Sequence, residues 1–289
     1  MKKLLLILLC LPMIGFGQNV NIPDANFKAY LVGNTAINMN GDTEIQVSEA
    51  AAFNGDIYCS NMNISDLTGI EAFTALGFLS CYSNQLSTLN LSQNVNLEAL
   101  ECFGNQLTSL DLNYNILISN LSVGFNNPMI IDFSTLINLK SLWFYNLLEL
   151  DLSNNSMLVS LDGGWNDQSL SYVNIQNGNN VNLTCDGTLP LSCGSFKNHL
   201  NLTCIQVDDV TWANTNWIDN IVWSGFPAID TTFQYFSTNC ALPTSIQEHT
   251  TNKELLKVTD LLGRETKEKN QPLFYIYDDG TVEKRLVIE

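Results

Sequence analysis

The most conspicuous shortage in this sequence is of basic residues. Between Gln18 and Pro243 the chain has three lysines and no arginine, against 20 aspartates and glutamates. Such a segment cannot neutralise a phosphate backbone, so nucleic-acid binding is excluded, and attraction to an anionic membrane surface is disfavoured for the same reason. From Thr244 onwards the chain has seven basic and nine acidic residues. This change in composition predicts a domain boundary near Pro243.

Long apolar runs are missing beyond the N-terminus. A membrane helix needs roughly 20 consecutive apolar residues, and no later segment approaches that length. The first 17 residues instead have the parts of a secretory signal peptide, with two lysines, an apolar run from Leu4 to Ile14 and small residues before Gln18. The alternative is a lipoprotein anchor at Cys10, which the preceding Leu9 disfavours. We therefore predict a signal peptide over 1–17 and an exported chain with no membrane span.

Motifs of known catalytic chemistry are scarce as well. Neither of the two histidines, His199 and His249, adjoins a serine or cysteine nucleophile motif, and the sequence has no phosphate-binding loop and no HExxH motif. Acids are plentiful, so a pair of carboxylates of the glycosidase kind stays an alternative. We predict a binding protein that is not an enzyme, with a glycan-cleaving enzyme as the minor alternative.

A repeat of 21 to 22 residues governs the middle of the chain. Five clear copies follow the pattern L-x-x-L-x-C-x-x-N or a close variant, and they begin at Leu76, Leu97, Ile118, Leu139 and Leu158. Weaker copies near Ile57 and Leu170 extend the match over 57–178. This pattern resembles the leucine-rich repeat, and its period lies within the range of that family.

The resemblance implies a solenoid of stacked repeats. Each copy is expected to contribute a short parallel strand ~4.8 Å from the next, and neighbouring copies stabilise one another because no single repeat can bury its apolar face. The asparagine after each strand is expected in a tight turn, where its amide satisfies backbone groups. Further apolar pairs predict a second wall with its own asparagines, namely Leu89 and Leu91, Leu110 and Leu112, Leu150 and Leu152, with Asn94, Asn115 and Asn155.

The predicted fold class is therefore a leucine-rich-repeat parallel β stack with few helices. We expect its register to slip by about two residues around Leu147, where the copies are less regular. The stack is expected to carry a small helical N-terminal cap over 18–56 and a disulfide-bonded C-terminal cap over 179–243. A small β-module over 244–289 completes the predicted organisation.

The cysteines of the mature chain fall into two groups. Cys59, Cys81 and Cys102 occupy one inward column of successive repeats, and we expect free, buried thiols because parallel side chains suit a disulfide poorly. The other four follow the repeats of an exported chain, where disulfides persist. Of the three pairings that four cysteines allow, we favour Cys185–Cys193 and Cys204–Cys240.

The N-terminal cap contains a loop rich in side-chain oxygens. A short amphipathic helix over 24–31 precedes the run Asn-x-Asn-Gly-Asp-x-Glu, and the spacing of this run resembles the calcium loop of EF-hands and dockerins. Two departures are an asparagine in place of the first aspartate and Thr43 where a glycine is usual. A loop held only by side-chain hydrogen bonds is the alternative. The resemblance implies that Ca²⁺ would be bound by Asn38, Asn40, Asp42, Glu44 and Glu49.

The tail has a second family resemblance. Two stretches, 255–265 and 272–285, resemble the type A C-terminal sorting domain of the type IX (Por) secretion system. The resemblance implies export by that machinery to the outer-membrane surface of a Gram-negative bacterium, and cleavage of the tail during attachment. By pattern alone the tail predicts strands at 255–261, 273–278 and 282–288, so a permanent small β-domain is the alternative. The residues that carry the resemblance include Asp260, Gly263, Arg264, Tyr275, Gly280 and Lys284.

In each predicted strand, two apolar side chains point inward. The side chains next to them are expected to face outward, on the concave surface of the sheet. This interpretation also places Tyr172, Asn174 and Gln176 on the last strand of that face. Exposed aromatics suit stacking on sugar rings or anchoring a protein partner, although aromatics are also good strand formers. We predict a cell-surface adhesion or recognition protein for a glycan or a protein, with a structural surface-layer or matrix protein as the alternative. The predicted binding aromatics are Tyr58, Phe78, Tyr82, Phe103, Trp143 and Tyr145.

Overall fold

The structure of the chain is a computed structural model. It describes residues 18–163, 169–183, 196, 199–215, 235–240, 255–259, 272–277 and 282–286. The chain divides into two compact units, Met1–Leu242 and Pro243–Glu289. The predicted signal peptide over 1–17 and the predicted pair Cys185–Cys193 lie outside the described residues.

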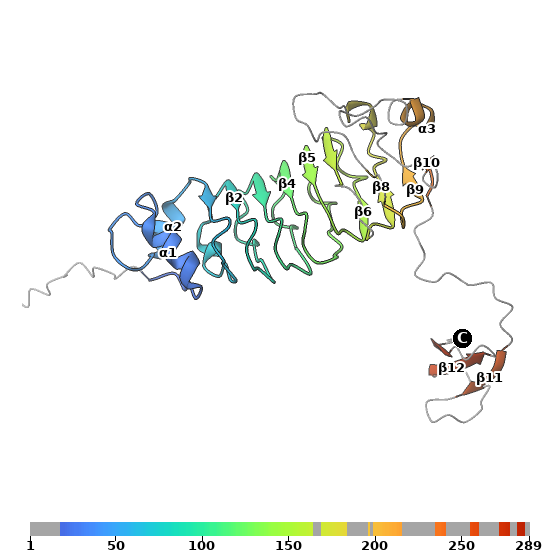
Figure 1. The fold of residues 1–289 in the computed structure, drawn as a ribbon, viewed down its shortest axis with the longest axis horizontal. Coiled ribbons are helices and arrows are strands. Elements are labelled where there is room, and N and C mark those ends of the chain that lie inside the picture. Colours follow the sequence, from blue (N-terminus) through green and yellow to red (C-terminus); the bar gives the residue numbers. More distant parts are fainter. Residues whose placement is uncertain are drawn as a thin grey trace, which may run out of the picture. The chain divides into compact units, whose positions relative to one another are not determined.

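Six short parallel strands stack side by side in the first unit (Figure 1). The central residue of each strand faces the central residue of the next, from Leu79 opposite Leu100 to Leu142 opposite Leu161. These leucines are buried, so each copy of the repeat contributes one strand and one inward leucine to a common core. The predicted leucine-rich-repeat fold class is confirmed. In order across the sheet, the strands are β1 (Ile57–Tyr58), β2 (Phe78–Ser80), β3 (Ala99–Glu101), β4 (Asn120–Ser122), β5 (Ser141–Trp143) and β7 (Ser160–Asp162).

A second parallel sheet belongs to the other wall of the coil. Its strands are, in order, β10 (Tyr235–Ser237), β9 (Cys204–Gln206), β8 (Tyr172–Asn174) and β6 (Glu149–Asp151). Because β8 pairs with β6, the prediction that Tyr172, Asn174 and Gln176 continue the face of the first sheet is wrong. Alternating inward residues suit a strand of either wall, so the spacing of the last copy could not distinguish them.

Asparagine side chains hold both corners of the repeats, as predicted. In the first ladder, formed by Asn84, Asn105 and Asn126, the amide is satisfied on both sides. Asn105 Nδ2 donates to the carbonyls of Cys81 and Cys102 at 3.1 and 3.0 Å, and its Oδ1 accepts from Leu86 N at 3.0 Å. In the second ladder, Asn94, Asn115 and Asn155 each donate to two carbonyls, whereas their buried Oδ1 atoms have no partner.

The three column cysteines are free and fully buried, which confirms that prediction. Burial raises the pKa of Cys59 and of Cys102 to about 12 from an ordinary value of 9.0. Such thiols are protonated and inert, and they act as small apolar side chains in the core.

The register changes between the fourth and fifth copies, as expected. The step from Leu139 to Leu158 spans 19 residues, whereas each of the three preceding steps spans 21. An isolated parallel bridge joins Met129 to Leu147, and Asn146 has a φ of 63° at this place.

Two helices close the N-terminal end of the core. The first, α1 (Ala25–Gly33), begins after Asp24, whose carboxylate accepts from the backbone N of Asn26 and Phe27 at 2.9 and 3.0 Å. The second, α2 (Val47–Ala52), begins with a capping box between Gln46 and Glu49. None of the helices among the described residues is long and apolar enough to cross a membrane.

Short elements complete the first unit, and three strands form the second. The former are η1 (Ile70–Ala72), η2 (Asn180–Asn182) and α3 (Val210–Ala213). The latter are antiparallel and match the three predicted strands: β11 (Leu255–Thr259), β12 (Pro272–Tyr277) and β13 (Val282–Leu286). Tyr275 lies on β12 and Lys284 on β13, while the other predicted sorting residues, Asp260, Gly263, Arg264 and Gly280, lie outside the described residues.

Candidate functional site

Five aromatic side chains form a continuous row on the outward side of the six-stranded sheet. We call this row the aromatic strip; its members are Tyr82, Phe103, Phe125, Trp143 and Tyr145. The rings of Tyr82 and Phe103 are stacked at 4.4 Å with an interplanar angle of 5°, and those of Phe125 and Tyr145 at 4.6 Å with 28°. Trp143 joins the two stacks, at 5.1 Å from Phe103 and 5.6 Å from Phe125. The structure therefore brings four of the six predicted aromatics together.

The repeat explains most of this row. Tyr82, Phe103 and Tyr145 stand at equivalent places, because each is the second residue after the end of its strand, β2, β3 or β5. Parallel strands lie ~4.8 Å apart, so rings at the same place in neighbouring copies meet face to face. The two other predicted aromatics, Tyr58 and Phe78, form a separate pair at 5.3 Å on β1 and β2.

The copy that contains β4 departs from this rule. The equivalent place is taken by Gly124, and a Cβ there would lie 2.7 Å from Cζ3 of Trp143, so the indole ring occupies the space. The next residue, Phe125, has a φ of 53° and is 53% exposed. Sequence reasoning missed Phe125 because it followed the column to Gly124. The inverted order of the two residues, Gly-Phe here but Phe-Gly in the preceding copy, was the available signal.

Negative charge accompanies the rings on this sheet. Glu101 on β3 accepts from Ser80 Oγ at 2.7 Å, and Ser80 Oγ lies 2.9 Å from Ser60 Oγ. The pKa of Tyr58 is raised, first because its hydroxyl donates to Asp56 and further by the charges of Asp56 and Glu101. None of the six strands contains a lysine or an arginine. The strands thus supply the carboxylate of Glu101 without a base of their own to neutralise it.

Comparison with known proteins gives partial matches. No family model matches the chain. Internalin J of Listeria monocytogenes is 38% identical over 72 residues, which are 25% of this chain and 8% of that protein. The chain therefore spans a small part of this relative.

Three solved structures from Listeria monocytogenes are similar to the chain. The functional domain of InlJ, described as including a cysteine ladder, matches with a TM-score of 0.46 at 29% identity, over 66% of this chain and 38% of that one. The internalin inlF matches with a TM-score of 0.46 at 18% identity, over 68% and 55%. Internalin C2 matches with a TM-score of 0.30 at 15% identity, over 64% and 93%.

Six parallel strands in one register, each from one copy of a leucine-rich pattern, decide the class. The chain has a leucine-rich-repeat fold. Its inward leucines, its column of free cysteines and its asparagine ladders all follow from that architecture. The aromatic strip does not, because the repeat prescribes only the inward residues and the turns.

The predicted calcium loop of this leucine-rich-repeat protein is closed by hydrogen bonds between its own residues. Asn38 Oδ1 accepts from Gly41 N at 3.0 Å, and Asp42 Oδ1 accepts from Glu44 N at 2.7 Å, a bond that is the first cause of the lowered pKa of Asp42. Both carboxylate oxygens of Glu49 accept from backbone N–H groups.

Two further contacts engage the remaining members of the loop. Asn40 Nδ2 donates to Asp42 Oδ2 at 2.9 Å, and Lys28 forms an ion pair with Glu44 at 2.6 Å. Among the described residues, no group of three or more His, Cys, Asp or Glu side chains is placed to hold a metal ion. Calcium binding stays a prediction, and thermal melts with and without millimolar calcium test it.

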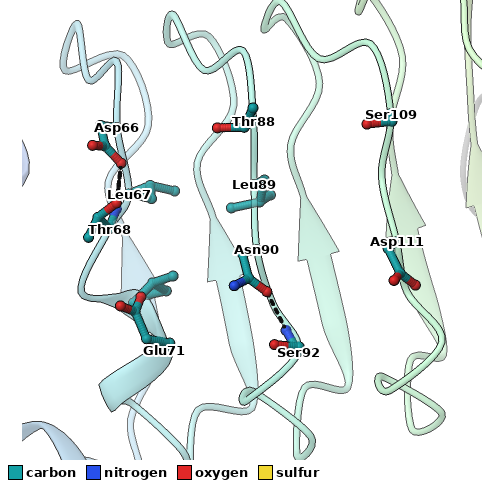
Figure 2. A pocket seen from close by; sticks show the side chains of 11 residues that line it. Asp66, Leu67, Thr68, Glu71, Thr88, Leu89, Asn90, Ser92, Ser109 and Asp111 are labelled. Atoms are coloured by element: carbon teal, nitrogen blue, oxygen red, sulfur yellow. Dashed lines mark hydrogen bonds between the residues drawn. The ribbon is translucent and has the colours of Figure 1, made fainter.

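A polar groove of about 340 Å³ lies on the second wall near the N-terminal end (Figure 2). Asp66 accepts from Thr68 N and Thr68 Oγ1 at 2.8 and 2.7 Å, and Asn90 Oδ1 accepts from Ser92 N at 3.1 Å. These side chains stabilise local turns of their own wall. The groove contains none of the predicted site residues.

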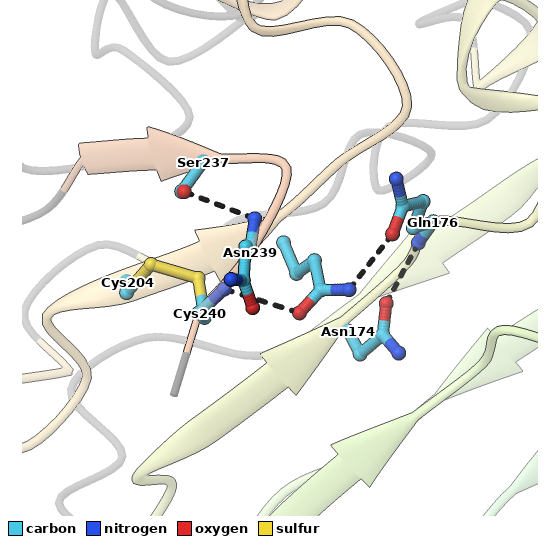
Figure 3. The surroundings of a disulfide bond; sticks show 7 residues. Asn174, Gln176, Cys204, Ser237, Asn239 and Cys240 are labelled. Atoms are coloured by element: carbon cyan, nitrogen blue, oxygen red, sulfur yellow. Dashed lines mark hydrogen bonds between the residues drawn. A yellow bond between two sulfur atoms is a disulfide. The ribbon is translucent and has the colours of Figure 1, made fainter. Parts of the chain in front are cut away.

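The C-terminal cap of the leucine-rich-repeat protein is joined by the predicted Cys204–Cys240 disulfide (Figure 3). This bond connects the start of β9 to the segment after β10. Gln206 secures the same segment, because its Oε1 accepts from Cys240 N at 3.2 Å and its Nε2 donates to Gln176 Oε1 at 2.8 Å. The cap therefore extends the second wall, which adds to its predicted role as a cover for the core. His199 is fully buried near Phe196.

Proposed function

We propose that this leucine-rich-repeat protein is an exported recognition protein that binds a partner protein through the aromatic strip and catalyses no reaction. The observation that carries the proposal is the strip itself, a row of five rings in mutual contact on one face of the sheet. Aromatic anchors dominate the energetics of protein interfaces, and contiguous exposed apolar patches commonly mark binding sites.

The ring geometry favours a protein over a glycan. Stacking on a sugar requires a free ring face. Tyr82 and Phe103 cover one face of each other, since they are nearly parallel at 4.4 Å, and Phe125 and Tyr145 do the same at 4.6 Å. Each of these four rings therefore has one face covered by its neighbour, which leaves less ring face for a sugar. Ring edges suit apolar and aromatic side chains of a protein, which meet them in edge-to-face contacts.

The charge of the sheet supports a partner with a basic surface. Glu101 lies in the same outward row as Trp143, two strands away, and no strand of the sheet supplies a base. The whole segment from Gln18 to Pro243 has only three lysines against 20 acids. Opposite charge around an apolar centre raises association rates and excludes wrong partners.

The two ends of the chain support export as part of this proposal. The basic and apolar start over 1–17 has the composition of a signal peptide. The tail over 244–289 resembles a type IX sorting domain, and it contains an antiparallel sheet of three strands. We therefore assign the protein to the outer-membrane surface of a Gram-negative bacterium. Deleting 244–289 should abolish its surface exposure in protease-shaving experiments, and an unchanged surface signal would contradict the assignment.

The binding proposal is tested with a random peptide library displayed on phage and selected on the full chain. Selected peptides should be enriched in basic and apolar residues and should bind with micromolar affinity. The triple variant Phe103→Ala, Trp143→Ala, Tyr145→Ala should lose this binding while it keeps its fold. The matched control, Asp111→Asn, Asp132→Asn, Asp151→Asn, changes three outward residues of the second wall and should bind as the wild type does.

A glycan array with the same proteins tests the alternative that the ligand is a glycan. Strong glycan binding that the triple variant loses would overturn the protein-ligand assignment in favour of sugars. Unchanged peptide binding by the folded triple variant would remove the strip from the site. A complete lack of ligands in both arms would favour a structural surface-layer or matrix role.

A further inference from the structure

The turns after five strands of the sheet, β1 to β5, repeat one backbone feature. The residue four places after the inward residue of the strand has a left-handed conformation, with φ of 59° at Asn61, 52° at Ser83, 65° at Gly104, 53° at Phe125 and 63° at Asn146. Glycine and asparagine adopt this region more readily than other residues, and a bulky aromatic residue there is an outlier. Phe125 is thus the one member of this series whose residue type opposes its backbone conformation.

The position just before the left-handed residue is also unusual in the copy that contains β4. It is aromatic in three copies, at Tyr82, Phe103 and Tyr145, but glycine at Gly124. Exchanging the two residues would restore the common pattern of an aromatic followed by a permissive residue. The chain therefore keeps a backbone arrangement here that costs stability, and such outliers are concentrated at functional sites.

The inversion has two structural results. Without a side chain at Gly124, the indole of Trp143 lies where a Cβ would be 2.7 Å from the ring, between Phe103 and Phe125. An aromatic side chain at Gly124 would exclude that position. The second result is that the Phe125 ring is 53% exposed, whereas the other four strip residues are only partly exposed.

We infer that Phe125 is the anchor of the strip, the ring that enters an apolar pocket of the basic partner protein, and that Gly124 is the positioning residue that seats Trp143 beside it. This inference rests on the proposed function and deepens it. An exposed ring held by stacking on Tyr145 and by contact with Trp143 loses little conformational entropy on binding, which is what an anchor residue requires.

The test uses a synthetic peptide obtained from the selection on the full chain. Phe125→Asn introduces the residue that the next copy has at this place, Asn146, and asparagine tolerates the backbone conformation. This variant should bind the peptide about 30-fold more weakly or worse, with a melting temperature within a few degrees of the wild type. Ser83→Asn, at the same place two copies earlier, is the matched control and should change neither quantity.

The positioning role has a separate readout. Gly124→Ala should weaken peptide binding because the Trp143 ring must move, although Phe125 is unchanged. In combination with Trp143→Leu, it should cause little further loss, so the two effects are strongly non-additive. Additive losses would overturn the positioning role of Gly124.

The outcomes separate the two proposals. If the wild type binds the peptide and the Phe103, Trp143 and Tyr145 triple variant does not, the proposed function holds. Wild-type affinity of Phe125→Asn in that case would overturn the anchor inference alone. A large fall in the melting temperature of Phe125→Asn would also overturn it, because the ring would then be a structural element of the turn. A wild type that binds no peptide would overturn the proposed function itself.

Discussion

The two walls of the solenoid come from the same repeat, yet their outward side chains follow different rules. On the second wall, Asn90, Asp111, Asp132 and Asp151 recur once per copy, and each side chain accepts from the backbone N two residues later at 2.9 to 3.1 Å. On the six-stranded sheet, the outward residues change from copy to copy and include the aromatic strip. A position that recurs with the same local bond serves the fold, whereas one that breaks the repeat is free to serve recognition.

The largest difference in stability between the two walls is expected at the C-terminal end of the second wall. The Cys204–Cys240 disulfide closes a segment with a sequence separation of 36, so its reduction should lower the free energy of unfolding of β9 and β10 by about 4 kcal/mol. Hydrogen exchange with and without reductant measures this change. Amides of β2 to β4 should keep their protection, since these strands are stabilised by neighbouring repeats. Equal loss of protection in both sheets would show that the walls unfold as one unit.

The next largest effect on the free energy of unfolding is expected at the asparagines of the corners between the walls. Asn105→Ala removes bonds to the carbonyls of Cys81 and Cys102 and to Leu86 N, all buried, and should lower the free energy of unfolding by about 3 kcal/mol. Urea denaturation measures the difference. Asn115→Leu is the matched change in the second ladder, where the third of the five clear copies already has a leucine, Leu136. Its cost should be smaller, and the reverse order would contradict the difference between the two ladders.

The buried thiols behind the six-stranded sheet should make the free energy of unfolding depend on pH. Cys102 has a pKa of about 12 in the folded chain, against an ordinary value of 9.0. Above pH 9 the unfolded thiol loses its proton while the buried thiol keeps it, so stability present below that pH is lost as the pH rises towards 12. At pH 10 one such thiol should lower the free energy of unfolding by about 1.4 kcal/mol.

Cys102→Val isolates this contribution, because Val123 occupies the same column one copy later and is fully buried. Urea unfolding at pH 8 and pH 10 should show a smaller loss of stability for the variant than for the wild type. Identical pH dependence of the two proteins would mean that the thiol ionises without unfolding.

Most of the fold could be predicted because its determinants are periodic. Leu79, Leu100 and Leu121 recur at the spacing of the repeat, and period alone predicts their parallel register. Membership of β8 in the second sheet could not be predicted, because alternation of inward residues is the same on both walls. The choice of wall depends on the path of the chain after β7, which is a property of packing and not of spacing.

The candidate site was predictable only where it obeys the repeat. Tyr82, Phe103 and Tyr145 were found because they share one position. Phe125 was missed because its ring reaches the strip through a left-handed backbone, a departure that periodicity cannot represent. The contact of Trp143 with the empty place at Gly124 likewise depends on side-chain volume, which a pattern of polar and apolar positions does not contain.

The smallest effect is expected at the regular outward column of the second wall. It tests whether these residues serve the fold and not recognition. The pKa of Asp132 is lowered, first by the hydroxyl and then by the backbone N–H of Ser134. Its contribution to stability is therefore present above the ordinary value of 3.8 and is lost as the pH falls through the lower folded value. Because solvent screens this exposed carboxylate, Asp132→Asn should change the free energy of unfolding by under ~0.5 kcal/mol. Asparagine already fills the equivalent place at Asn90 and makes the same turn, so urea denaturation and peptide binding should both match the wild type. A loss of peptide binding in this variant would mean that the second wall, too, contacts the partner.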